Sequence, residues 1–339
     1  MSVLGLDIGS KTVKMVELEK EKDSFKLKAS GIVGYSGKTV EKMKDAKEYV
    51  TLSEVIKKLH KEAKFSSKEV VLAIPESLVY TRSLKFPMLT DAEIASAVKW
   101  EAEQYIPIPP EEAIIQHTII ERNEETSPPS VKVLIVAVQT ELVKKYAKVI
   151  EKAGLKLIAV ETEMLALVRS LAPDKGSVLL VDLGARSTNI AIAKDKNLSF
   201  TRSIPTAGDA FSRALSQTFG IDESQAEEYK KTYGLSPSQL EGKVSQALNP
   251  VVSMVNDEMK KAIQFYKTEE ASPAPKSAVL TGGTAGMKDI SNTFTNLLGI
   301  EVVVGNPFSK VQVDPEMAKT LVNYAPLYSI AVGLSMRDI

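Results

Sequence analysis

The feature of this sequence that most limits its fold is an internal repeat of an apolar segment that ends in Asp-x-Gly. Residues 179–188 (LLVDLGARST) align without a gap on residues 4–13 (LGLDIGSKTV), 175 positions earlier. Copies this far apart cannot be neighbouring turns of a solenoid, so the repeat predicts two homologous domains that face each other. Each copy is an apolar strand, a glycine turn and the start of a second strand, which together indicate a hairpin.

The turn of each hairpin has the chemistry of a phosphate site. A glycine after the aspartate brings backbone N–H groups close to an anion without a Cβ in the way, and hydroxyl or ammonium side chains add donors. Asp7 and Asp182 are expected to hold a hydrated Mg²⁺ through its waters, and Lys14 is expected to extend toward the phosphates. The alternative is that each Asp-x-Gly is only a tight turn. The residues expected to grip a polyphosphate from opposite sides are Gly9, Ser10, Lys11, Thr12, Gly184, Ser187 and Thr188.

A third glycine-rich segment lies near the end of the second half. It reads VLTGGTAGM over residues 279–287, which predicts a strand, a glycine turn and then a helix whose N-terminus is open toward anions. The segment does not have the dinucleotide-binding pattern, because Thr281 stands where that pattern has glycine. The residues expected to approach a nucleoside here are Gly282, Gly283, Thr284 and Met287.

Composition narrows the class of protein. The chain has 43 Lys plus Arg and 43 Asp plus Glu, a formal net charge of zero, whereas nucleic-acid binders usually carry a basic surplus. Cysteine is absent, which removes disulfides and thiol chemistry and agrees with a reducing compartment. No signal peptide and no apolar run of roughly 20 residues is visible, so we expect a cytoplasmic protein that reaches a membrane only through a partner. The lysines expected to form a solvated face rather than a nucleic-acid patch are Lys57, Lys58, Lys61 and Lys64.

The order of predicted elements suggests where the domains lie. The first domain is expected at 1–176 and the second at 177–323, with a mostly helical part at 208–275. A last helix, at about 324–339, is expected to return to the first domain.

Residues 79–157 read as a small inserted α/β unit with its own strands and two helices. Thr90 and Glu93 have the spacing of a capping box at the start of the first of these helices. Trp100, further along that helix, is expected to anchor the core of the unit. The insertion carries none of the glycine-rich motifs, so we expect it to bind a peptide from a membrane partner in a groove.

The two hairpins and the glycine turn, in this order and spacing, resemble the superfamily of actin, sugar kinases and Hsp70. The resemblance covers nearly the whole chain and implies an actin-like fold, in which two homologous α/β domains flank a cleft for ATP and Mg²⁺. By position it also implies that Gly208 contacts a phosphate, that Glu227 and Lys230 flank the ribose and adenine, and that Glu163 orients an attacking water. Without the resemblance, Glu227 and Lys230 could be a solvated ion pair and Glu163 a first-turn acid favoured by the helix dipole.

Within this superfamily, the insertion at 79–157 is similar to the one in the cell-division protein FtsA and in the PilM family of type IV pilus assembly proteins. The run EAEQYIPIP at 101–109 and the ending AVGLSMR at 331–337 resemble PilM, whereas FtsA continues into an amphipathic membrane-binding tail. This resemblance implies capture of the N-terminal cytoplasmic tail of PilN, and contact with other pilus assembly proteins, at the cytoplasmic face of the inner membrane. An FtsA-like division protein and a sugar or acetate kinase are the alternatives. Slow ATP turnover and homo-oligomer formation are left open.

Overall fold

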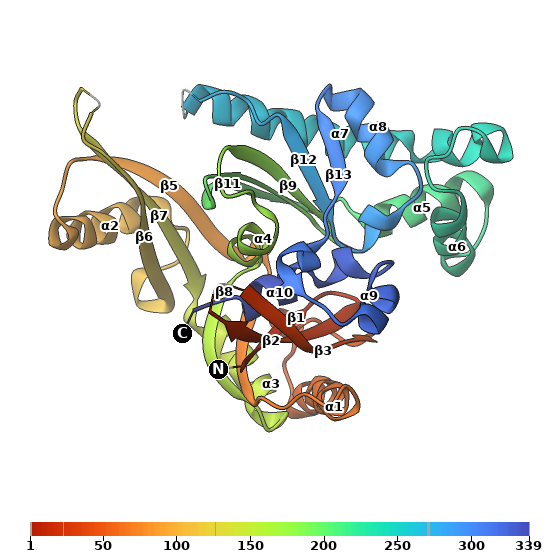
Figure 1. The fold of residues 1–339 in the computed structure, drawn as a ribbon, viewed down its shortest axis with the longest axis horizontal. Helices are drawn as coiled ribbons and strands as arrows, with labels where there is room; N and C mark the ends of the chain where they lie inside the picture. The colour runs from red at the N-terminus through yellow and green to blue at the C-terminus, as the bar shows by residue number, and fades with distance from the viewer. Residues whose placement is uncertain (1, 23, 126, 270–271, 339) are drawn as a thin grey trace.

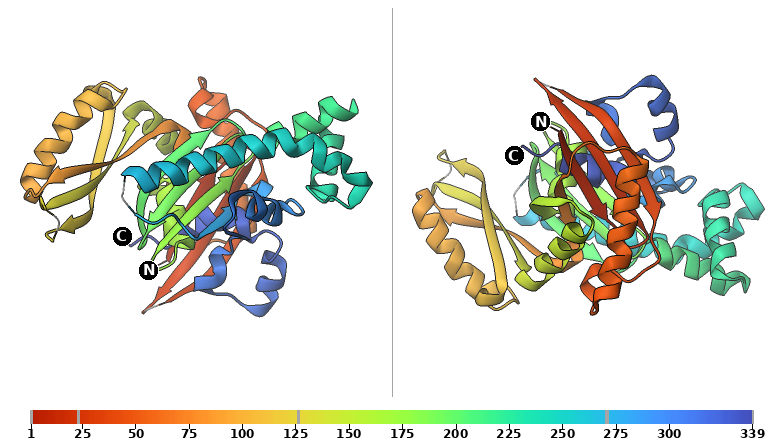
Figure 2. Two further views of the ribbon diagram at one scale, coloured as in Figure 1. Left: turned by 90° about the horizontal axis from the view of Figure 1, so that it is seen from above. Right: turned by 90° about the horizontal axis from the view of Figure 1, so that it is seen from below.

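The computed structural model describes residues 2–22, 24–125, 127–269 and 272–338. Met1 and Ile339, which end two of the predicted ranges, lie outside the described residues. The described chain forms two large sheets and a smaller third sheet, with helices around and between them (Figures 1 and 2). Among these residues, no helix is both long enough and apolar enough to cross a membrane.

The first large sheet is built on the N-terminal hairpin. Strands β1 and β2 pair antiparallel, whereas β1 pairs parallel with β4 and β4 pairs parallel with β8. Helices α1 (Ala46–Glu62) and α3 (Thr140–Lys152) cover one face with apolar side chains at helical spacing. In spatial order the strands are β14 (Val311–Gln312), β3 (Ser24–Gly34), β2 (Thr12–Glu21), β1 (Ser2–Ile8), β4 (Glu69–Ile74) and β8 (Lys156–Thr162).

The second large sheet repeats the plan of the first. Its first three strands pair antiparallel, and β9, β12 and β13 pair parallel, so β11-β10-β9-β12-β13 matches β3-β2-β1-β4-β8 in order and direction. The sequence repeat is therefore also a repeat of topology, as expected for two homologous α/β units. The strands are β11 (Asn197–Ile204), β10 (Thr188–Lys194), β9 (Ser177–Leu183), β12 (Ser277–Thr281) and β13 (Glu301–Val304).

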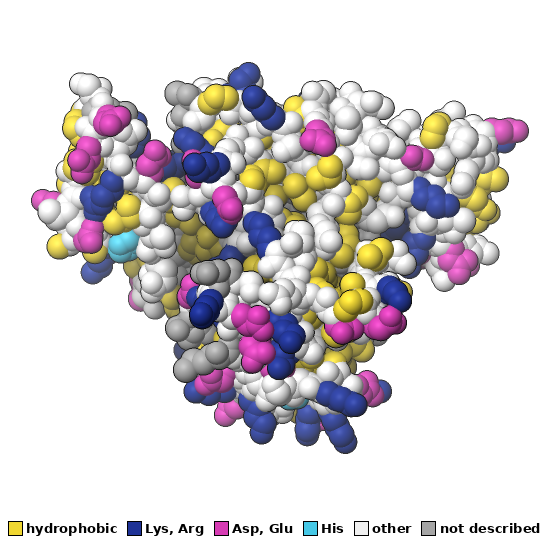
Figure 3. All heavy atoms as spheres, in the orientation of Figure 1, with side chains coloured by type: hydrophobic (Ala, Val, Ile, Leu, Met, Phe, Trp, Pro, Cys, Tyr) yellow, Lys and Arg dark blue, Asp and Glu magenta, His cyan; other side chains and the backbone are white. Residues whose placement is uncertain are grey.

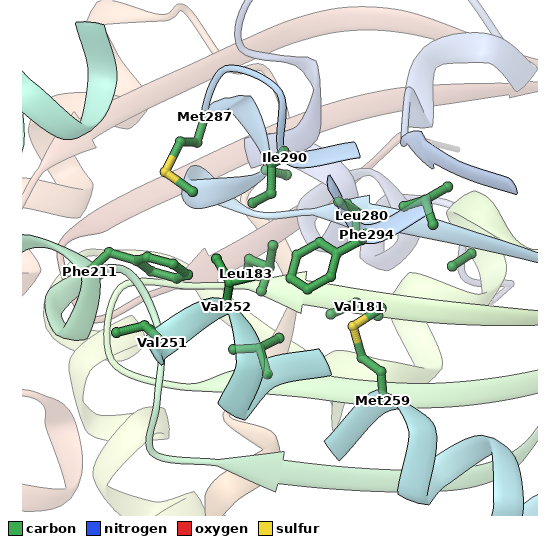
Figure 4. Close-up of a cluster of buried hydrophobic side chains, with 14 of the residues drawn as sticks. Val181, Leu183, Phe211, Val251, Val252, Met259, Leu280, Met287, Ile290 and Phe294 are labelled. Atoms are coloured by element: carbon green, nitrogen blue, oxygen red, sulfur yellow. The ribbon is translucent and has the colours of Figure 1, made fainter. Parts of the chain in front are cut away.

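A helical layer packs on the outer face of the second sheet. The core there joins strand residues such as Val181 and Leu183 to Phe211, Met259 and Phe294 from three helices (Figure 4). These side chains are apolar on the inward face of each helix and are completely buried. The helices of the second half are α5 (Gly208–Phe219), α6 (Glu223–Tyr233), α7 (Lys243–Glu269) and α8 (Ile290–Leu298).

Two short helices lie between the large sheets. Helix α4 (Glu163–Leu171) packs on β9 and β10, and α10 (Ser329–Ser335) packs on β1, β2 and β4. The two helices cross very closely, because a Cβ on Gly333 would lie only 1.9 Å from the carbonyl oxygen of Ala166. The last helix begins at Ser329 rather than near Tyr324, since a 3-10 turn over Ala325–Tyr328 precedes it. Helix α9 (Pro315–Leu321) lies beside this segment.

The insertion forms the third sheet, in the order β5-β7-β6 with all strands antiparallel. Helix α2 (Asp91–Tyr105) covers one face and starts with the predicted capping box of Thr90 and Glu93. Helix α3, also within the predicted range 79–157, packs on α1 and the first large sheet instead. The strands are β5 (Val79–Pro87), β6 (Ala113–Asn123) and β7 (Ser130–Gln139).

The expectation for Trp100 was wrong. Its side chain is 60% exposed on the outer face of α2. The helix buries Ile94, Val98 and Ala102, which are four residues apart and so occupy one face. Trp100 lies on the opposite face of the helix, and the apolar core of the insertion is complete without it.

Candidate functional site

A cleft of about 850 Å³ opens between the two hairpins, the glycine turn after β12 and the start of α5. Its volume is in the range of small-molecule sites, roughly 300–1,000 Å³. The residues predicted to form the site line this cleft, with the exceptions of Thr188 and Met287. The fold therefore brings together in one cavity residues that lie in separate segments of the sequence.

The two hairpin turns have the same backbone geometry. The N–H of Gly9 donates to the carbonyl of Thr12 (3.0 Å), and the N–H of Gly184 donates to the carbonyl of Ser187 (3.1 Å). A Cβ on Gly9 would meet the Lys14 ammonium at 3.0 Å, and one on Gly184 would meet the Ser187 carbonyl oxygen at 2.8 Å. A Cβ would therefore clash with the backbone in the second turn, and in the first it would crowd the end of the Lys14 side chain.

The floor of the first hairpin is a buried ion pair. Lys14 Nζ lies 2.9 Å from Asp7 Oδ2, and both side chains are almost fully buried. Burial alone would lower the pKa of Lys14, but attraction by Asp7, and then by Asp182 and Glu163, outweighs it and raises the pKa above its ordinary value. Lys14 is therefore a fixed positive charge within a group of acids.

Among the described residues, the Lys14–Asp7 pair has no counterpart at the base of the second hairpin. Asn189 takes the position that matches Lys14, opposite Asp182 in the β9–β10 pairing. Its amide Nδ2 lies 3.0 Å from Glu163 Oε2 and 3.4 Å from Asp182 Oδ2. Burial, opposed by Lys14 and assisted by Asp7, raises the pKa of Asp182 to about 6. Burial, with the nearby charges of Asp182 and Asp7, also raises the pKa of Glu163 well above its ordinary value.

Glu76 and Asn189 are buried residues of the cleft that the sequence analysis missed. The backbone N–H of Glu76 donates to Glu163 Oε2 (3.0 Å), and its own Oε1 accepts from Thr201 Oγ1 (2.9 Å). Burial raises the pKa of Glu76. Asn189 could have been found from the repeat, since it stands 175 positions after Lys14. Glu76 has no such signal, because only the tertiary fold brings it to Glu163.

One wall of the cleft comes from α5 and α6. The N–H of Gly208 donates to the carbonyl of Gly184 (3.0 Å), which fixes the start of α5 against the second turn. Lys230 Nζ donates to the Gly208 carbonyl (3.1 Å) and to Glu227 Oε2 (2.6 Å), and Lys230 is only 6% exposed. Burial raises the pKa of Glu227, but the hydrogen bonds from Lys230 and Ser212 outweigh it and lower this pKa to about 2. Glu227 and Lys230 are thus partly or fully buried, unlike a solvated surface pair.

The glycine turn departs from its predicted form. Gly282 has φ of 85°, and a Cβ there would lie 2.4 Å from Asp182 Oδ1, so this position requires glycine. The turn continues as a short 3-10 helix over Gly283–Gly286, and α8 begins only at Ile290 after Asp289 in the left-handed conformation. The expected helix N-terminus therefore does not lie at the turn. Thr284 Oγ1 donates to the Gly184 carbonyl (3.1 Å) and so ties the glycine turn to the second hairpin.

Two predicted site residues have other roles. Met287 points into the core of the second half, among Phe211 and Ile290 (Figure 4). Its side chain follows the 3-10 turn back into the protein, away from the cleft. Thr188 is fully buried and its hydroxyl donates to the Thr206 carbonyl (2.6 Å), so it secures the base of the second hairpin.

The mouth of the cleft carries one ionic contact between its two sides. Lys11, in the first turn, forms an ion pair with Asp209 in the first turn of α5. Both side chains are partly exposed. Tyr324 and Leu327 also line the cleft, from the segment between α9 and α10, and no sequence motif pointed to them.

These residues suit a magnesium-bound nucleoside polyphosphate. The glycines line the cleft without a Cβ that would narrow it, and Lys11 and Lys14 supply positive charge. The described residues contain no group of three or more His, Cys, Asp or Glu side chains able to hold a metal. Mg²⁺ typically keeps several waters and takes one or two carboxylates plus phosphate oxygens, which is what Asp7 and Asp182 can supply.

Comparison with known proteins places the whole chain in one group. The family model described as "Type IV pilus assembly protein PilM" matches residues 5–339. The chain belongs to the PilM family. A solved structure of a PilM-PilN type IV pilus biogenesis complex has 27% sequence identity and a TM-score of 0.85, covering 99% of this chain and 98% of that one. The family match favours a PilM protein over the kinase alternative, and the structural match shows the actin-like fold.

Similarity extends beyond the PilM family at lower levels. FtsA of Pseudomonas aeruginosa is 26% identical over 270 residues, which are 70% of this chain and 63% of FtsA. The chain spans about three fifths of the length of that relative. MreB 5 of Spiroplasma citri, solved with AMPPNP bound, has 14% identity and a TM-score of 0.55, with 98% of this chain and 94% of that chain covered. At that identity the likeness concerns the fold alone.

Proposed function

We propose that this protein is the ATP-binding component of type IV pilus assembly that captures the N-terminal cytoplasmic tail of PilN. The observation that carries the proposal is the PilM family match over residues 5–339, together with the likeness to a PilM-PilN complex over almost the full chain. The protein would act at the cytoplasmic face of the inner membrane, where PilN and other assembly proteins hold it.

In this proposal ATP and Mg²⁺ bind between the two hairpins. The turn residues and Gly208 hold the phosphates, and Asp7 and Asp182 hold the waters of the metal. Glu227, Lys230 and the turn of Gly282–Thr284 border the nucleoside. Two actin-like units, 1–176 and 177–323, would then close on the nucleotide, with 208–275 as the helical part of the second and 324–339 returning to the first.

In this proposal Glu163 would orient a water beside the phosphates. It lies between the hairpins and is fixed by the Glu76 N–H and the Asn189 amide. Burial, with the nearby charges of Asp182 and Asp7, raises the pKa of Glu163 above its ordinary value. Slow turnover is expected in this role, because an assembly protein can work as a binding-state switch.

The insertion is the part of the chain proposed to take the PilN tail. It has a sheet edge, since β6 pairs only with β7 within the described chain, and Ile114 on this strand is exposed. An extended peptide can add to such an edge through backbone hydrogen bonds, with side-chain pockets giving selectivity. None of the residues that line the nucleotide cleft lies on β6 or α2.

A labelled peptide with the N-terminal sequence of the organism's own PilN tests this proposal. Ile114→Lys should weaken peptide binding at least tenfold, because lysine on an edge strand opposes strand addition. Val303→Lys is the matched control, since Val303 is also an exposed apolar residue on an edge strand, β13, but outside the insertion. If a scrambled peptide bound as tightly, or both variants lost binding equally, the assignment would have to be abandoned.

A further inference from the structure

One surface of the first half, outside the nucleotide cleft, is dense in lysine. Helices α1 and α3 pack side by side over the first large sheet, and their outer sides face solvent (Figure 2, right). Figure 3 shows dark blue side chains gathered at the lower end of the molecule, where Figure 1 places α1. We call this surface the lysine face, and its members are Lys47, Lys57, Lys58, Lys61, Lys64, Lys68, Lys144, Lys148 and Lys152.

The charges of the lysine face are only partly neutralised. Three of its lysines have acidic neighbours along the same helix, namely Lys57 with Glu54 (3.5 Å), Lys58 with Glu62 (3.7 Å) and Lys144 with Glu141 (3.9 Å). Exposed pairs this long contribute little. Within the described residues, the structure records no ion pair for Lys47, Lys61, Lys64, Lys68 or Lys152, and all five are exposed. Because the whole chain is neutral, this is a local surplus of positive charge.

The chemistry of the lysine face favours a diffuse anionic partner. Residues 38–68 and 140–156 contain no arginine, so the planar fork that binds phosphates and base edges bidentately is absent from these segments. Val50, on the same side of α1 as Lys47 and Lys61, is 44% exposed and offers a small apolar contact among the charges. Point charges spread over two adjacent helices, with an exposed apolar residue on one of them, match the interfacial region of a bilayer.

We propose that the lysine face binds the anionic headgroups of a lipid bilayer directly. The proposal rests on the proposed function only for the choice of a bilayer over other polyanions, since a PilN-bound protein would lie next to a membrane. The rest of the argument is the complementarity between the exposed lysines and the negative charge of the headgroups. Lipid contact would then orient the protein and add to its attachment through a peptide, so that two weak contacts act together.

Co-sedimentation with vesicles tests this proposal on the full chain without PilN. Phosphatidylcholine vesicles with roughly one-third phosphatidylglycerol should retain the protein, pure phosphatidylcholine vesicles should not, and added salt should release it. Lys61→Glu with Lys152→Glu should reduce the partition constant at least about tenfold, since each lysine near an anionic surface contributes about a factor of five. Both substitutions are at exposed positions in the last turns of α1 and α3.

Lys260→Glu with Lys267→Glu is the matched control, because these exposed lysines lie on α7 and the change in net charge is the same. Equal loss of binding in both double variants, or equal binding to neutral vesicles, would overturn the proposal. So would tighter binding to a DNA or RNA fragment, or to a second copy of the chain, than to the anionic vesicles. Because the vesicles contain no PilN, failure here is distinct from failure of peptide capture.

Discussion

The two hairpins share one backbone design and differ in the chemistry beneath it. In the first, Lys14 pairs with Asp7, whereas in the second the matching residue, Asn189, offers Asp182 only an amide. The first aspartate is therefore neutralised before any ligand binds. Asp182 lies among acidic groups whose nearby cation, Lys14, is already paired with Asp7. Burial raises the pKa of Asp182 to about 6. Two turns with the same backbone geometry thus differ in charge. Asp7 already has a cationic partner in Lys14, whereas Asp182 can still accept a positive charge from a ligand.

Removing the cation should give the largest effect. Lys14→Met leaves Asp7 buried without its partner beside Asp182 and Glu163, and losing one member of a buried pair costs about 3–5 kcal/mol. Asn189→Leu, the matched change in the second hairpin, removes hydrogen bonds and should cost about 1–3 kcal/mol. Urea unfolding of the nucleotide-free proteins at pH 8 measures both. Equal losses of unfolding free energy would mean that Lys14 and Asn189 contribute equally to the stability of their hairpins.

The two aspartates should respond to neutralisation with opposite signs. The folded pKa of Asp182 is about 6 against an ordinary value of 3.8, so the folded state retains a proton that the unfolded state has released. Through Asp182, stability therefore falls as pH rises from about 4 to about 7, by up to about 3 kcal/mol, and the raised pKa values of Glu163 and Glu76 act in the same direction. Asp182→Asn should remove the share of this fall that comes from Asp182 and stabilise the protein at pH 8. Asp7→Asn should destabilise the protein at pH 8, because Lys14 loses its partner.

Unfolding measured without nucleotide or metal from pH 4 to pH 8 distinguishes these outcomes. A parallel pH profile for Asp182→Asn and wild type would contradict the assignment of this proton to Asp182.

The same two variants test the metal. If both carboxylates hold the waters of Mg²⁺, each variant should bind Mg-ATP roughly 10- to 150-fold more weakly, the equivalent of losing about 1.5–3 kcal/mol of charged hydrogen bonding. In EDTA the loss should disappear, because fewer negative charges then face the phosphates. Calorimetry with and without Mg²⁺ measures both affinities. Unchanged Mg-ATP binding in both variants would exclude the two-hairpin site.

The smallest effect is expected at the mouth of the cleft. Asp209→Asn breaks the contact with Lys11 and frees that ammonium for phosphate, so Mg-ATP binding should tighten by up to about fivefold, while unfolding changes by less than about 1 kcal/mol. Glu316→Gln is the control, since it breaks an exposed pair with Lys319 away from the cleft. Equal nucleotide affinity in the two variants would remove any role for the Lys11–Asp209 pair.

The parts of the structure that the sequence predicted best are those with local causes. Each hairpin follows from apolar strands on either side of a glycine turn, although the pairing of Asp7 with Lys14 across it was not predicted. The capping box at Thr90 is equally local. The repeat then required the two hairpins to occupy matching places in matching sheets, which the structure confirms.

The parts that escaped prediction depend on contacts between distant segments. Met287 was placed at the nucleoside because it follows the glycine turn, but that turn continues as a 3-10 helix over Gly283–Gly286 and Met287 enters the core. Trp100 was assigned to a core that α2 completes with smaller side chains. Glu76 and Leu327 reach the cleft only because α4 and α10 bring their neighbouring segments together. No pattern within a single segment carries that information.

The last helix has a consequence for how the chain is made. One face of β2 and β3 is covered by residues between Phe308 and Met336, and Ser335 lies 2.7 Å from the Val16 carbonyl oxygen although 319 residues separate them. A ribosome that adds about 5–20 residues per second takes on the order of 15 to 60 seconds to supply that cover. During this time the newly made N-terminal sheet has an uncovered apolar face. The chain should therefore depend on chaperones during synthesis, and ribosome-bound chains that end before α10 should be cleaved in β2 and β3 by proteases that spare the finished protein.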